Sequence, residues 1–465
     1  MRGDRPRDAE GEMIPEPWRH GIVAVVGLGK SGVAATKLLA RAGVRVYASD
    51  ASDHPYGGDA LADLGALSGV SLDVGRHDLA RIRTAAAVIV SPGVPPEAAA
   101  LVAARAAGVP VLSEIDLGFR ALAASGTRSI AITGTNGKTT TTALAAHLLR
   151  AAGLDAEAAG NIGRPLADIA VQGDQYQWLA IEISSFQLHD SPHFAPDIGI
   201  LTNLAPDHLD RYPAVEAYYA DKRQLFRNAG DANVWVLNGD DPAVLELAAG
   251  AKGRRLLFSL ERPADGWYDR AERRLRLGAK GPALLARADL GLLGDHNVAN
   301  ALAAALAVHE AGVAPGVIGE GLRSFRALPH RLEPVREVGG VLWINDSKAT
   351  NIASTVVAVE AMDRPFVLLL GGRHKGEPYT RLGPPLKERC RLVIAYGEAG
   401  PLVERDLSGQ VPLERGTTFE DVVARAGRVA RAGDAVLLSP ACSSYDMFKN
   451  YEERGATFRR LVEAM

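Results

Sequence analysis

Cysteine is almost absent from this chain of 465 residues, which has only Cys390 and Cys442, far apart in the sequence. Two distant cysteines provide neither a disulfide framework nor the spacing of a cysteine metal site, and they favour a reducing compartment. No apolar run approaches the ~18 residues of a membrane-spanning helix, and residues 1–20 lack the apolar core of a signal peptide. We therefore expect a cytoplasmic protein with no membrane contact, and a frayed extension over residues 1–20.

An excess of charge of either sign is also missing. The 52 Lys and Arg residues and 55 Asp and Glu residues leave a net charge of −3. A chain this close to neutrality has no general field to attract nucleic acid, so any anion that it binds must be held by local groups. We also find no internal repeat and no low-complexity tract. The hydrophobic content of 47% is ample for several buried cores.

Apolar strand patterns alternate with helical patterns along the chain, which predicts an α/β protein with parallel sheets. The length suggests about three domains. We predict a Rossmann-like domain over residues 21–115, a P-loop ATPase-like domain with a parallel sheet over 116–325, and a second Rossmann-like domain over 326–465. The predicted strands are 21–26, 44–48, 86–90, 129–133, 178–183, 198–202, 234–237, 341–345, 366–370, 392–395 and 435–438.

Residues 129–140 read as a strand, a glycine-rich turn and the start of a helix. Gly134 and Gly137 let the backbone approach phosphate oxygens, and the helix N-terminus adds unpaired N–H groups. Lys138 supplies a positive charge and Thr139 a hydroxyl suited to Mg²⁺. The loop is a shorter variant of the usual pattern, because an isoleucine occupies its first glycine position. We predict an ATP site, and the alternative is an ordinary turn before a helix. The predicted contacts are Gly134, Thr135, Asn136, Gly137, Lys138, Thr139 and Thr140.

A second glycine motif, Gly27-x-Gly29-x-x-Gly32, follows the first predicted strand, and Asp50 ends the next one. This is the context of a dinucleotide site, in which a pyrophosphate binds at a helix N-terminus. The residues leave three possibilities open: a nicotinamide cofactor, another nucleotide or its diphosphate, or a tight turn without a ligand. In either nucleotide case Asp50 can accept a hydrogen bond from a ribose or a uracil.

Three side chains are candidates for metal or substrate contacts. Glu182 ends a predicted strand beside the phosphate loop, where a Mg²⁺ ligand belongs, although it can also cap the following helix. His208 lies in a strand-end loop among carboxylates, which favours a metal or substrate contact over simple packing. Lys222, judged by its neighbours alone, is expected to be a solvated helix residue.

Nine segments carry a resemblance to a known family. In chain order they are TGTNGKTT, EISSFQL, APDHLDRY, ADKRQLF, GDHNVANALAA, PHRLE, INDSKATN, LLLGGRHKG and SPACSSYDMFKNYEERG. Together they resemble the Mur ligases of peptidoglycan synthesis, from about residue 20 to the end. The last four segments are similar to the member that adds D-glutamate, and the DNPR segment typical of the member that adds a diamino acid does not occur.

The resemblance implies an ATP-dependent ligase that joins D-glutamate to UDP-N-acetylmuramoyl-L-alanine through an acyl phosphate. It implies that the Gly27-x-Gly29-x-x-Gly32 motif holds the UDP precursor rather than a nicotinamide. It also implies that the third domain closes over the nucleotide. We expect a monomer. The implied precursor contacts are Leu28, Gly29, Lys30, Ser31, Asp50, Ser91, Pro92, Gly93, Asn161 and His208.

Further site residues follow from the same resemblance. The implied additional ATP contacts are Asn297, Asn300, Arg331 and Asp346. Two Mg²⁺ ions are implied, with Thr139, Glu182, His208 and a carbamylated Lys222 as ligands, because carbamylation turns an ammonium into a carboxylate. The implied catalytic residues are Lys138, Lys222, His208 and Arg331. The implied D-glutamate contacts are Lys348, Thr350, Lys375, Ser444, Tyr445 and Tyr451, of which the two tyrosines replace the Leu and Phe of other members.

Three rival classes each leave part of the sequence unexplained. A nicotinamide oxidoreductase does not account for TGTNGKTT. A non-catalytic nucleotide-binding module does not account for the Lys, Thr and Ser residues predicted in the third domain. A sibling such as folylpolyglutamate synthase does not account for the N-terminal glycine motif. Ser444 is not expected to be an acyl-transfer nucleophile, because no His–Asp pair accompanies it.

Overall fold

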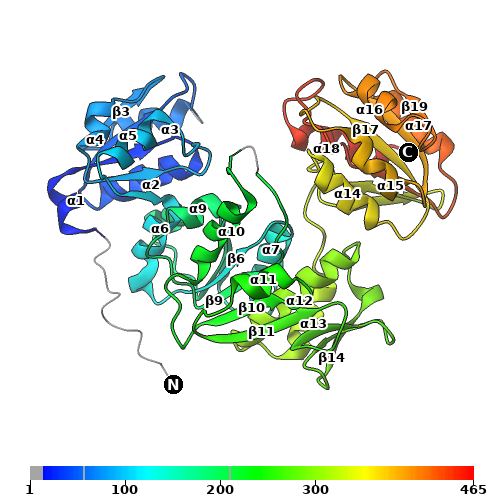
Figure 1. Cartoon of the computed structure of the whole chain (residues 1–465), viewed down its shortest axis with the longest axis horizontal. Helices are drawn as coiled ribbons and strands as arrows, with labels where there is room; N and C mark the ends of the chain where they lie inside the picture. The colour runs from blue at the N-terminus through cyan, green and yellow to red at the C-terminus, as the bar shows by residue number, and fades with distance from the viewer. Residues whose placement is uncertain (1–13, 56–57, 209–210) are drawn as a thin grey trace. The chain divides into compact units, whose positions relative to one another are not determined.

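A computed structural model describes residues 14–55, 58–208 and 211–465 (Figure 1). The chain divides into two units, Met1–Arg287 with Ala299–Arg323, and Ala288–Val298 with Ser324–Met465. The first unit contains two β-sheets and the second unit contains one. These three sheets with their helices confirm the predicted α/β class. Among the described residues no helix is both long and apolar enough to cross a bilayer.

The N-terminal segment differs from the expected frayed extension at its inner end. Residues 1–13 lie outside the described residues, but helix α1 spans Glu16–His20. Ile14 and Trp18 are each 4% exposed and belong to the core of the first sheet. The expectation is therefore wrong for residues 14–20, because an isoleucine and a tryptophan give this segment enough apolar surface to pack.

The first sheet has five parallel strands in the order β3-β2-β1-β4-β5. Val23 and Val25 of β1 pack on one face, and Ala24 and Val26 pack on the other. The strand order reverses between β1 and β4, and ligands of open α/β sheets bind at such a reversal. The strands are β1 (Ile22–Val26), β2 (Arg45–Asp50), β3 (Val70–Val74), β4 (Ala87–Val90) and β5 (Val111–Ser113), and the helices are α2 (Lys30–Arg41), α3 (Gly58–Gly65), α4 (Leu79–Arg83) and α5 (Ala99–Ala106).

Helix α6 (Glu114–Leu122) connects the first sheet to the second. Ser113 caps this helix, and its backbone N–H donates to the carbonyl oxygen of Asp190 at 2.6 Å. A Cβ on Gly118 would lie 2.4 Å from the Leu166 Cβ of helix α8 (Leu166–Gln172), so only glycine permits this close packing. Asp116 is fully buried and accepts from the backbone and ring of His193. The connection is thus fixed by buried contacts.

Glu114, at the start of α6, is a buried carboxyl group whose ionisation should affect the stability of the fold. One of its carboxylate oxygens accepts from the backbone N–H of Ala167 at 2.6 Å, and the other has no hydrogen-bond partner among the described residues. Burial raises the pKa of Glu114 from 4.5 to about 7. A carboxyl group with a raised pKa stabilises the fold fully at pH values below its unfolded pKa, and this contribution is lost as the pH rises through the folded value.

We expect Glu114→Gln to flatten the pH dependence of stability. Wild type should lose up to about 3 kcal/mol of unfolding free energy relative to the variant as the pH rises from the lower to the higher pKa. Urea unfolding of both proteins across this pH range measures the difference. Glu246→Gln, at an exposed position, is the control and should follow wild type. Parallel curves for wild type and Glu114→Gln would contradict the assignment.

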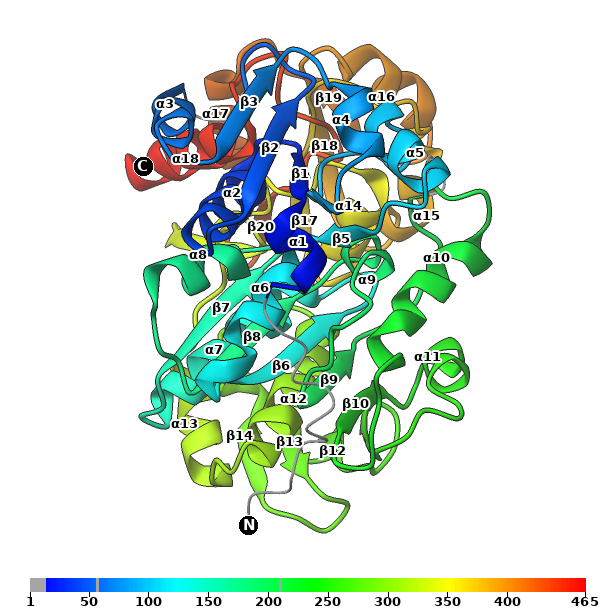
Figure 2. The same cartoon turned by 90° about the vertical axis from the view of Figure 1, so that its left-hand side faces the viewer.

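The second sheet has nine strands in the order β14-β13-β12-β11-β10-β9-β6-β8-β7. It is parallel from β7 to β12, and β13 and β14 add an antiparallel edge (Figures 1 and 2). The strands are β6 (Arg128–Thr133), β7 (Ala156–Gly160), β8 (Trp178–Glu182), β9 (Ile198–Leu201), β10 (Val234–Asn238), β11 (Arg254–Ser259), β12 (Gly266–Asp269), β13 (Arg274–Leu277) and β14 (Ala283–Ala286). The helices are α7 (Lys138–Ala151), α9 (Ser185–His189), α10 (Val215–Arg223), α11 (Pro242–Leu247), α12 (Asp295–Glu310) and α13 (Pro315–Ser324).

The third sheet has six strands in the order β15-β16-β20-β17-β18-β19, and only β15 runs antiparallel to its neighbour. Its strands β16, β20 and β17 are adjacent, so their carboxyl ends lie at one edge. The strands are β15 (Glu333–Val338), β16 (Val341–Asn345), β17 (Phe366–Gly371), β18 (Cys390–Tyr396), β19 (Leu413–Arg415) and β20 (Ala435–Leu438). The helices are α14 (Ile352–Glu360), α15 (Gly383–Leu386), α16 (Gly400–Leu407), α17 (Phe419–Val429) and α18 (Tyr451–Glu463).

Candidate active site

The phosphate loop lies between helix α7 and strand β6, which pairs with β9 and β8 in the second sheet. Gly134 has φ +143° and Gly137 has φ +84°. A Cβ on Gly134 would lie 2.0 Å from the Thr202 hydroxyl, and one on Gly137 would lie 2.2 Å from Asn300 Oδ1. Both positions therefore require glycine. The Thr202 hydroxyl donates to the carbonyl of Asn136 at 2.7 Å, which fixes the loop against the end of β9.

Two lysines meet at one carbonyl of this loop. Lys138 Nζ donates to the carbonyls of Gly134 and Thr135 at 2.9 and 2.7 Å, and Lys222 Nζ donates to the Gly134 carbonyl at 2.7 Å. The side chain of Lys138 thus crosses the mouth of the loop, where a phosphate chain binds in loops of this type. Lys222 lies behind the loop and is only 1% exposed.

The burial of Lys222 contradicts the expectation of a solvated helix residue. It lies one turn after Tyr218 on α10, and this face packs on the loop, with Lys222 Nζ 4.6 Å from the Tyr218 ring centroid. Burial, and then the positive charge of Lys138, lower the pKa of Lys222 well below its ordinary value, while the carboxylates of Asp207, Asp221 and Glu182 oppose the shift. A lysine with a strongly lowered pKa presents a neutral, nucleophilic amine.

Glu182 ends β8 and is 2% exposed. Its Oε1 accepts from Asn161 Nδ2 at 2.8 Å, whereas its Oε2 has no hydrogen-bond partner among the described residues. The alternative role as a helix cap is wrong, because Ser184 and Gln187 form the capping box of α9. A buried carboxylate oxygen without a protein partner fits a divalent-cation ligand.

His208 lies in the turn after β9 and has φ +54°, an uncommon conformation for histidine. Its ring lies 5.2 Å from the Phe186 ring and 6.0 Å from the Tyr218 ring, centroid to centroid. His208 Nε2 is 3.6 Å from an Asp207 oxygen. Phe186 and Tyr218 thus form an aromatic wall beside His208, and the Tyr218 ring also lies beside Lys222.

Thr139 and Thr140 lie in the first turn of α7 and are partly buried. Among the described residues no group of three or more His, Cys, Asp and Glu side chains is arranged to hold a metal ion. The candidate set differs from such a group, because it combines the carboxylate of Glu182 and the imidazole of His208 with the Thr139 hydroxyl and Lys222. Its fit to Mg²⁺ therefore depends on Glu182 Oε2 and on the chemistry of the buried amine.

The other glycine motif follows β1 in the first sheet. Leu28 N–H donates to Asp50 Oδ2 at 2.6 Å, and the Ser91 hydroxyl donates to the Gly27 carbonyl at 2.8 Å. A Cβ on Gly32 would lie 1.8 Å from the Gly27 oxygen, whereas one on Gly29 would meet no atom within 4 Å. Asp50 and Ser91 thus hold the turn in place, and no atom of the described residues fills the space beside Gly29. Around it lie Lys30 and Ser31, which begin α2, and Pro92 and Gly93, which follow Ser91.

In the second unit, two predicted nucleotide contacts lie close together, because Arg331 comes just before β15 and Asp346 just after its neighbour β16. Asp346 is 7% exposed, and its two oxygens accept from the Leu332 N–H at 3.1 Å and the Ser439 hydroxyl at 2.8 Å. Burial raises the pKa of Asp346 to about 7, although the positive charge of Arg331 lowers it. In the same unit the buried Asn297 donates from Nδ2 to the Leu293 carbonyl at 2.7 Å.

The predicted amino-acid contacts lie at the carboxyl ends of β16, β17 and β20. Lys375 Nζ donates to the Thr350 hydroxyl at 3.4 Å, and Lys348 Nζ lies 5.3 Å from the Tyr451 ring centroid. Ser444 is 2% exposed, whereas the neighbouring Tyr445 is 64% exposed. The adjacency of the three strands therefore gathers residues that are up to about a hundred positions apart in the sequence.

Sequence reasoning missed Arg454, which links two of these loops. It is fully buried in α18, and its guanidinium donates to the Ser347 hydroxyl at 2.9 Å, to the Ser347 carbonyl at 2.8 Å and to the Cys442 carbonyl at 3.2 Å. Arg454 lies inside the last of the nine segments, but a charged residue near a helix start gives no sequence signal of burial. Tyr218, whose hydroxyl lies 3.3 Å from that of Thr135, was also missed, because the contact depends on how α10 packs against the phosphate loop.

Comparisons with known proteins agree with this architecture. Three family descriptions match successive regions: "Mur ligase MurD-like, N-terminal domain" over residues 21–113, "Mur ligase middle domain" over 132–308, and "Mur ligase, glutamate ligase domain" over 330–442. A UDP-N-acetylmuramoylalanine-D-glutamate ligase of Salinibacter ruber is 43% identical, covering 97% of this chain and 100% of that protein. One of Acidobacterium capsulatum is 40% identical, covering 95% and 96%.

Solved structures share the fold at low identity. UDP-N-acetylmuramate-alanine ligase MurC of Thermotoga maritima aligns with a TM-score of 0.59 and 19% identity, covering 96% of this chain and 99% of that one. MurF ligase of the same organism, in complex with ADP, aligns with a TM-score of 0.59 and 18% identity, covering 83% and 91%.

The three α/β sheets and the central phosphate loop, taken with these relatives, place the protein in the class of ATP-dependent ligases. The chain belongs to the Mur ligase family, as the full-length relatives establish.

Proposed function

We propose that this protein joins D-glutamate to UDP-N-acetylmuramoyl-L-alanine in the cytoplasm, with ATP as the energy source. The relatives that match over the full chain have this activity in their names. The observation that carries the proposal is the open Glu182 oxygen beside a glycine loop on which Lys138 and Lys222 converge. The protein acts as a monomer on small molecules, and its domains divide at residues 21–115, 116–325 and 326–465.

The reaction proceeds in two transfers. A carboxylate oxygen of the L-alanine residue attacks the γ-phosphorus of ATP, which forms an acyl phosphate and releases ADP. The D-glutamate nitrogen then attacks the acyl carbon, phosphate leaves with the bonding electrons, and the nitrogen loses a proton. Lys138 stabilises negative charge on the transferred phosphoryl group, which is where charge-stabilising groups contribute most.

The chain's own residues fit Mg²⁺ at the phosphate loop. Glu182 Oε2, the Thr139 hydroxyl and His208 are the proposed ligands, together with Lys222 once carbamylated. The neutral Lys222 nitrogen attacks the carbon of CO₂ and loses a proton, which gives a carbamate with two oxygens. When bound, Mg²⁺ supplies charge neutralisation between the phosphates and the attacking carboxylate. ATP contacts are residues 134–140 with Asn297, Asn300, Arg331 and Asp346.

The precursor and the amino acid bind on different sheets. The diphosphate binds where Gly29 opens the first glycine turn, with Leu28, Lys30 and Ser31 around it. Asp50 and residues 91–93 border the uridine, and Asn161 and His208 border the sugar. D-Glutamate binds at the third sheet, where two ammonium groups suit two carboxylates. Its contacts are Lys348, Thr350, Lys375, Ser444, Tyr445 and Tyr451.

The substitution Gly29→Ala should weaken binding of the UDP precursor without destabilising the fold. The added methyl meets no protein atom within 4 Å, and the backbone of Gly29 has a negative φ that alanine adopts readily. We expect the melting temperature to stay near that of wild type while the KM for the UDP precursor rises about tenfold or more, because the methyl occupies the space of the diphosphate. Gly43→Ala, which also meets no protein atom but has φ +76°, should lower stability without changing that KM. An unchanged KM in Gly29→Ala would contradict the assignment.

Phosphate release tests the proposed function directly. We expect release with ATP, Mg²⁺ and UDP-N-acetylmuramoyl-L-alanine when D-glutamate is the acceptor, and much less with L-glutamate, L-alanine or a diamino acid. A preference for another acceptor would identify a different branch of the family. A change of nicotinamide absorbance without phosphate release would instead reveal an oxidoreductase.

A further inference from the structure

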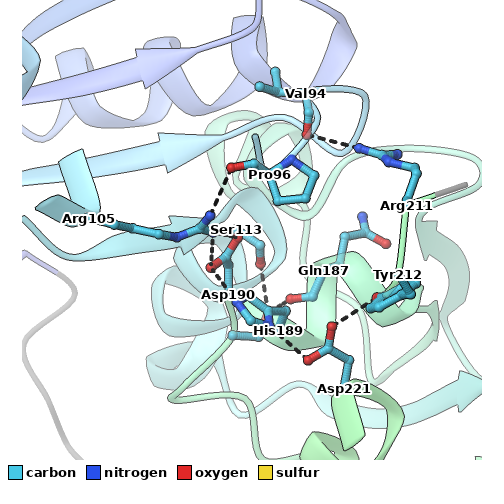
Figure 3. Close-up of polar contacts among 11 residues, drawn as sticks. Val94, Pro96, Arg105, Ser113, Gln187, His189, Asp190, Arg211, Tyr212 and Asp221 are labelled. Carbon is cyan, nitrogen blue, oxygen red and sulfur yellow. Dashed lines mark hydrogen bonds and ion pairs between the residues drawn. The ribbon is translucent and has the colours of Figure 1, made fainter. Parts of the chain in front are cut away.

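One carboxylate beside Lys222 joins three separate segments of the first unit. Asp221 of α10 accepts from the Tyr212 hydroxyl through Oδ2 at 2.9 Å, and its Oδ1 lies 2.7 Å from Nδ1 of His189 at the end of α9 (Figure 3). The Asp221 side chain is only 15% exposed. We refer to these three residues as the Asp221 clasp. The hydrogen bond to Asp221 also raises the pKa of His189, which favours a charged, tightly held ring.

The Tyr212 end of the clasp orients the aromatic wall of the candidate site. The Tyr212 ring stacks on Phe186, with centroids 5.3 Å apart and an interplanar angle of 9°, and lies 5.3 Å from the Tyr218 ring. Phe186 and Tyr218 in turn flank the His208 ring, and Tyr218 also covers Lys222. A rotation of Tyr212 would therefore disturb both neighbours of His208.

The His189 end of the clasp is tied to the first sheet. The next residue, Asp190, forms an ion pair with Arg105 of α5 at 3.2 Å, and its carbonyl accepts from Ser113 (Figure 3). Arg105 also donates to the Pro96 carbonyl at 3.2 Å, a few residues beyond the proposed uridine loop. The clasp thus connects α10, through α9, to the first sheet and its helix α5.

We propose that Asp221 is a positioning residue for this reaction, which holds Lys222 and the His208 turn in register with the phosphate loop through its hydrogen bonds to His189 and Tyr212. Asp221 is not among the proposed contacts to substrate or metal. Partners that orient metal ligands from outside contribute strongly to metal affinity, because a ligand that rotates freely loses its geometry. This inference rests on the proposed function for the identity of the ligands.

Asp221→Ala and Tyr212→Phe test the clasp separately. The first removes both hydrogen bonds, and the second removes one hydroxyl but keeps the stacked ring. The matched control is Asp269→Asn, because Asp269 is similarly shielded at 14% exposure and pairs with Arg276 at 3.0 Å on the far antiparallel edge of the second sheet. Its substitution should cost comparable stability without touching the candidate ligands.

Two half-saturation constants report on positioning. One is the Mg²⁺ concentration for half-maximal phosphate release. The other is the bicarbonate concentration for half-maximal formation of a lysine carbamate, detected by ¹³C NMR with labelled bicarbonate and assigned by its loss in Lys222→Ala. We expect Asp221→Ala to raise both about tenfold or more, and Tyr212→Phe to raise both by a smaller factor. Asp269→Asn should leave both unchanged.

Wild-type values of both constants in Asp221→Ala and Tyr212→Phe, with melting temperatures lowered as in Asp269→Asn, would overturn the proposal and leave a purely structural clasp. Failure of the proposed function looks different. In that case wild type releases no phosphate with D-glutamate, while the clasp variants still shift the carbamate signal. If no carbamate forms in any of the proteins, the Mg²⁺ dependence of phosphate release decides.

Discussion

Lys138→Ala is expected to lower the rate of phosphate release by about 10²-fold or more, because it removes the full positive charge that we propose to face the transferred phosphoryl group. Lys138 Nζ lies at the mouth of the loop, between the carbonyls of Gly134 and Thr135. The glycines that shape the loop are unaffected, so we expect the melting temperature to remain close to that of wild type. Steady-state kinetics with both substrates saturating measure the effect on turnover.

Two companion variants make this result specific. Lys138→Arg keeps the charge with a different shape, and we expect it to retain more activity than the alanine variant. Lys252→Ala removes an exposed lysine elsewhere in the same unit and should behave as wild type. Near-normal ADP release by Lys138→Ala would remove this lysine from the mechanism and with it the assignment of the loop.

Glu182→Gln is expected to lower activity by about 10- to 100-fold at limiting Mg²⁺ and to raise the Mg²⁺ concentration needed for half-maximal rate. The amide keeps the shape of the side chain, and its oxygen still accepts from Asn161. Its nitrogen replaces the open oxygen and cannot ligate a cation. A titration of phosphate release with Mg²⁺ distinguishes lost metal affinity from lost fold.

The control for this prediction is Glu310→Gln, which weakens an ion pair with Arg254 on the same unit. It should leave the Mg²⁺ titration unchanged. If Glu182→Gln gave the same Mg²⁺ dependence as wild type, the buried oxygen would serve only the hydrogen-bond network around Asn161, and the metal would have to be held by other groups.

Most of the central strands were predictable because they are uninterrupted apolar runs that end at glycine or polar residues. The prediction 129–133 corresponds to Arg128–Thr133, and 366–370 corresponds to Phe366–Gly371. Such strands are buried on both faces of a parallel sheet, so nearly all of their residues are apolar and the sequence shows them directly. The turn after β6 was predictable for a different reason, because Gly134 and Gly137 are sterically required there.

Edge strands were missed. Val70–Val74 and Ala156–Gly160 lie at the edges of their sheets, and Ala283–Ala286 closes the antiparallel extension. These segments are short and include charged, small or exposed residues, because an edge strand packs against fewer neighbours. Their pairing depends on the strand beside them, which local sequence patterns do not reveal.

In the candidate site, too, some features could be predicted from the local sequence and others could not. The glycine loops and the strand-end carboxylate Glu182 could be recognised locally, whereas the burial of Lys222 could not, because it depends on which face of α10 meets the loop. The Asp221 clasp could not be predicted from the sequence at all. It joins residues from α9, a turn and α10, and no spacing rule relates three such segments before the chain is folded.

The third sheet has an evolutionary consequence. Its strands β16, β20 and β17 end side by side and carry the proposed contacts to the amino acid, while the phosphate loop stands on another sheet in the other unit. Mutations in three short loops can therefore change which building block is selected and leave the phosphate loop intact. A lineage with this division of labour can diversify its products by altering one part and inheriting the other unchanged.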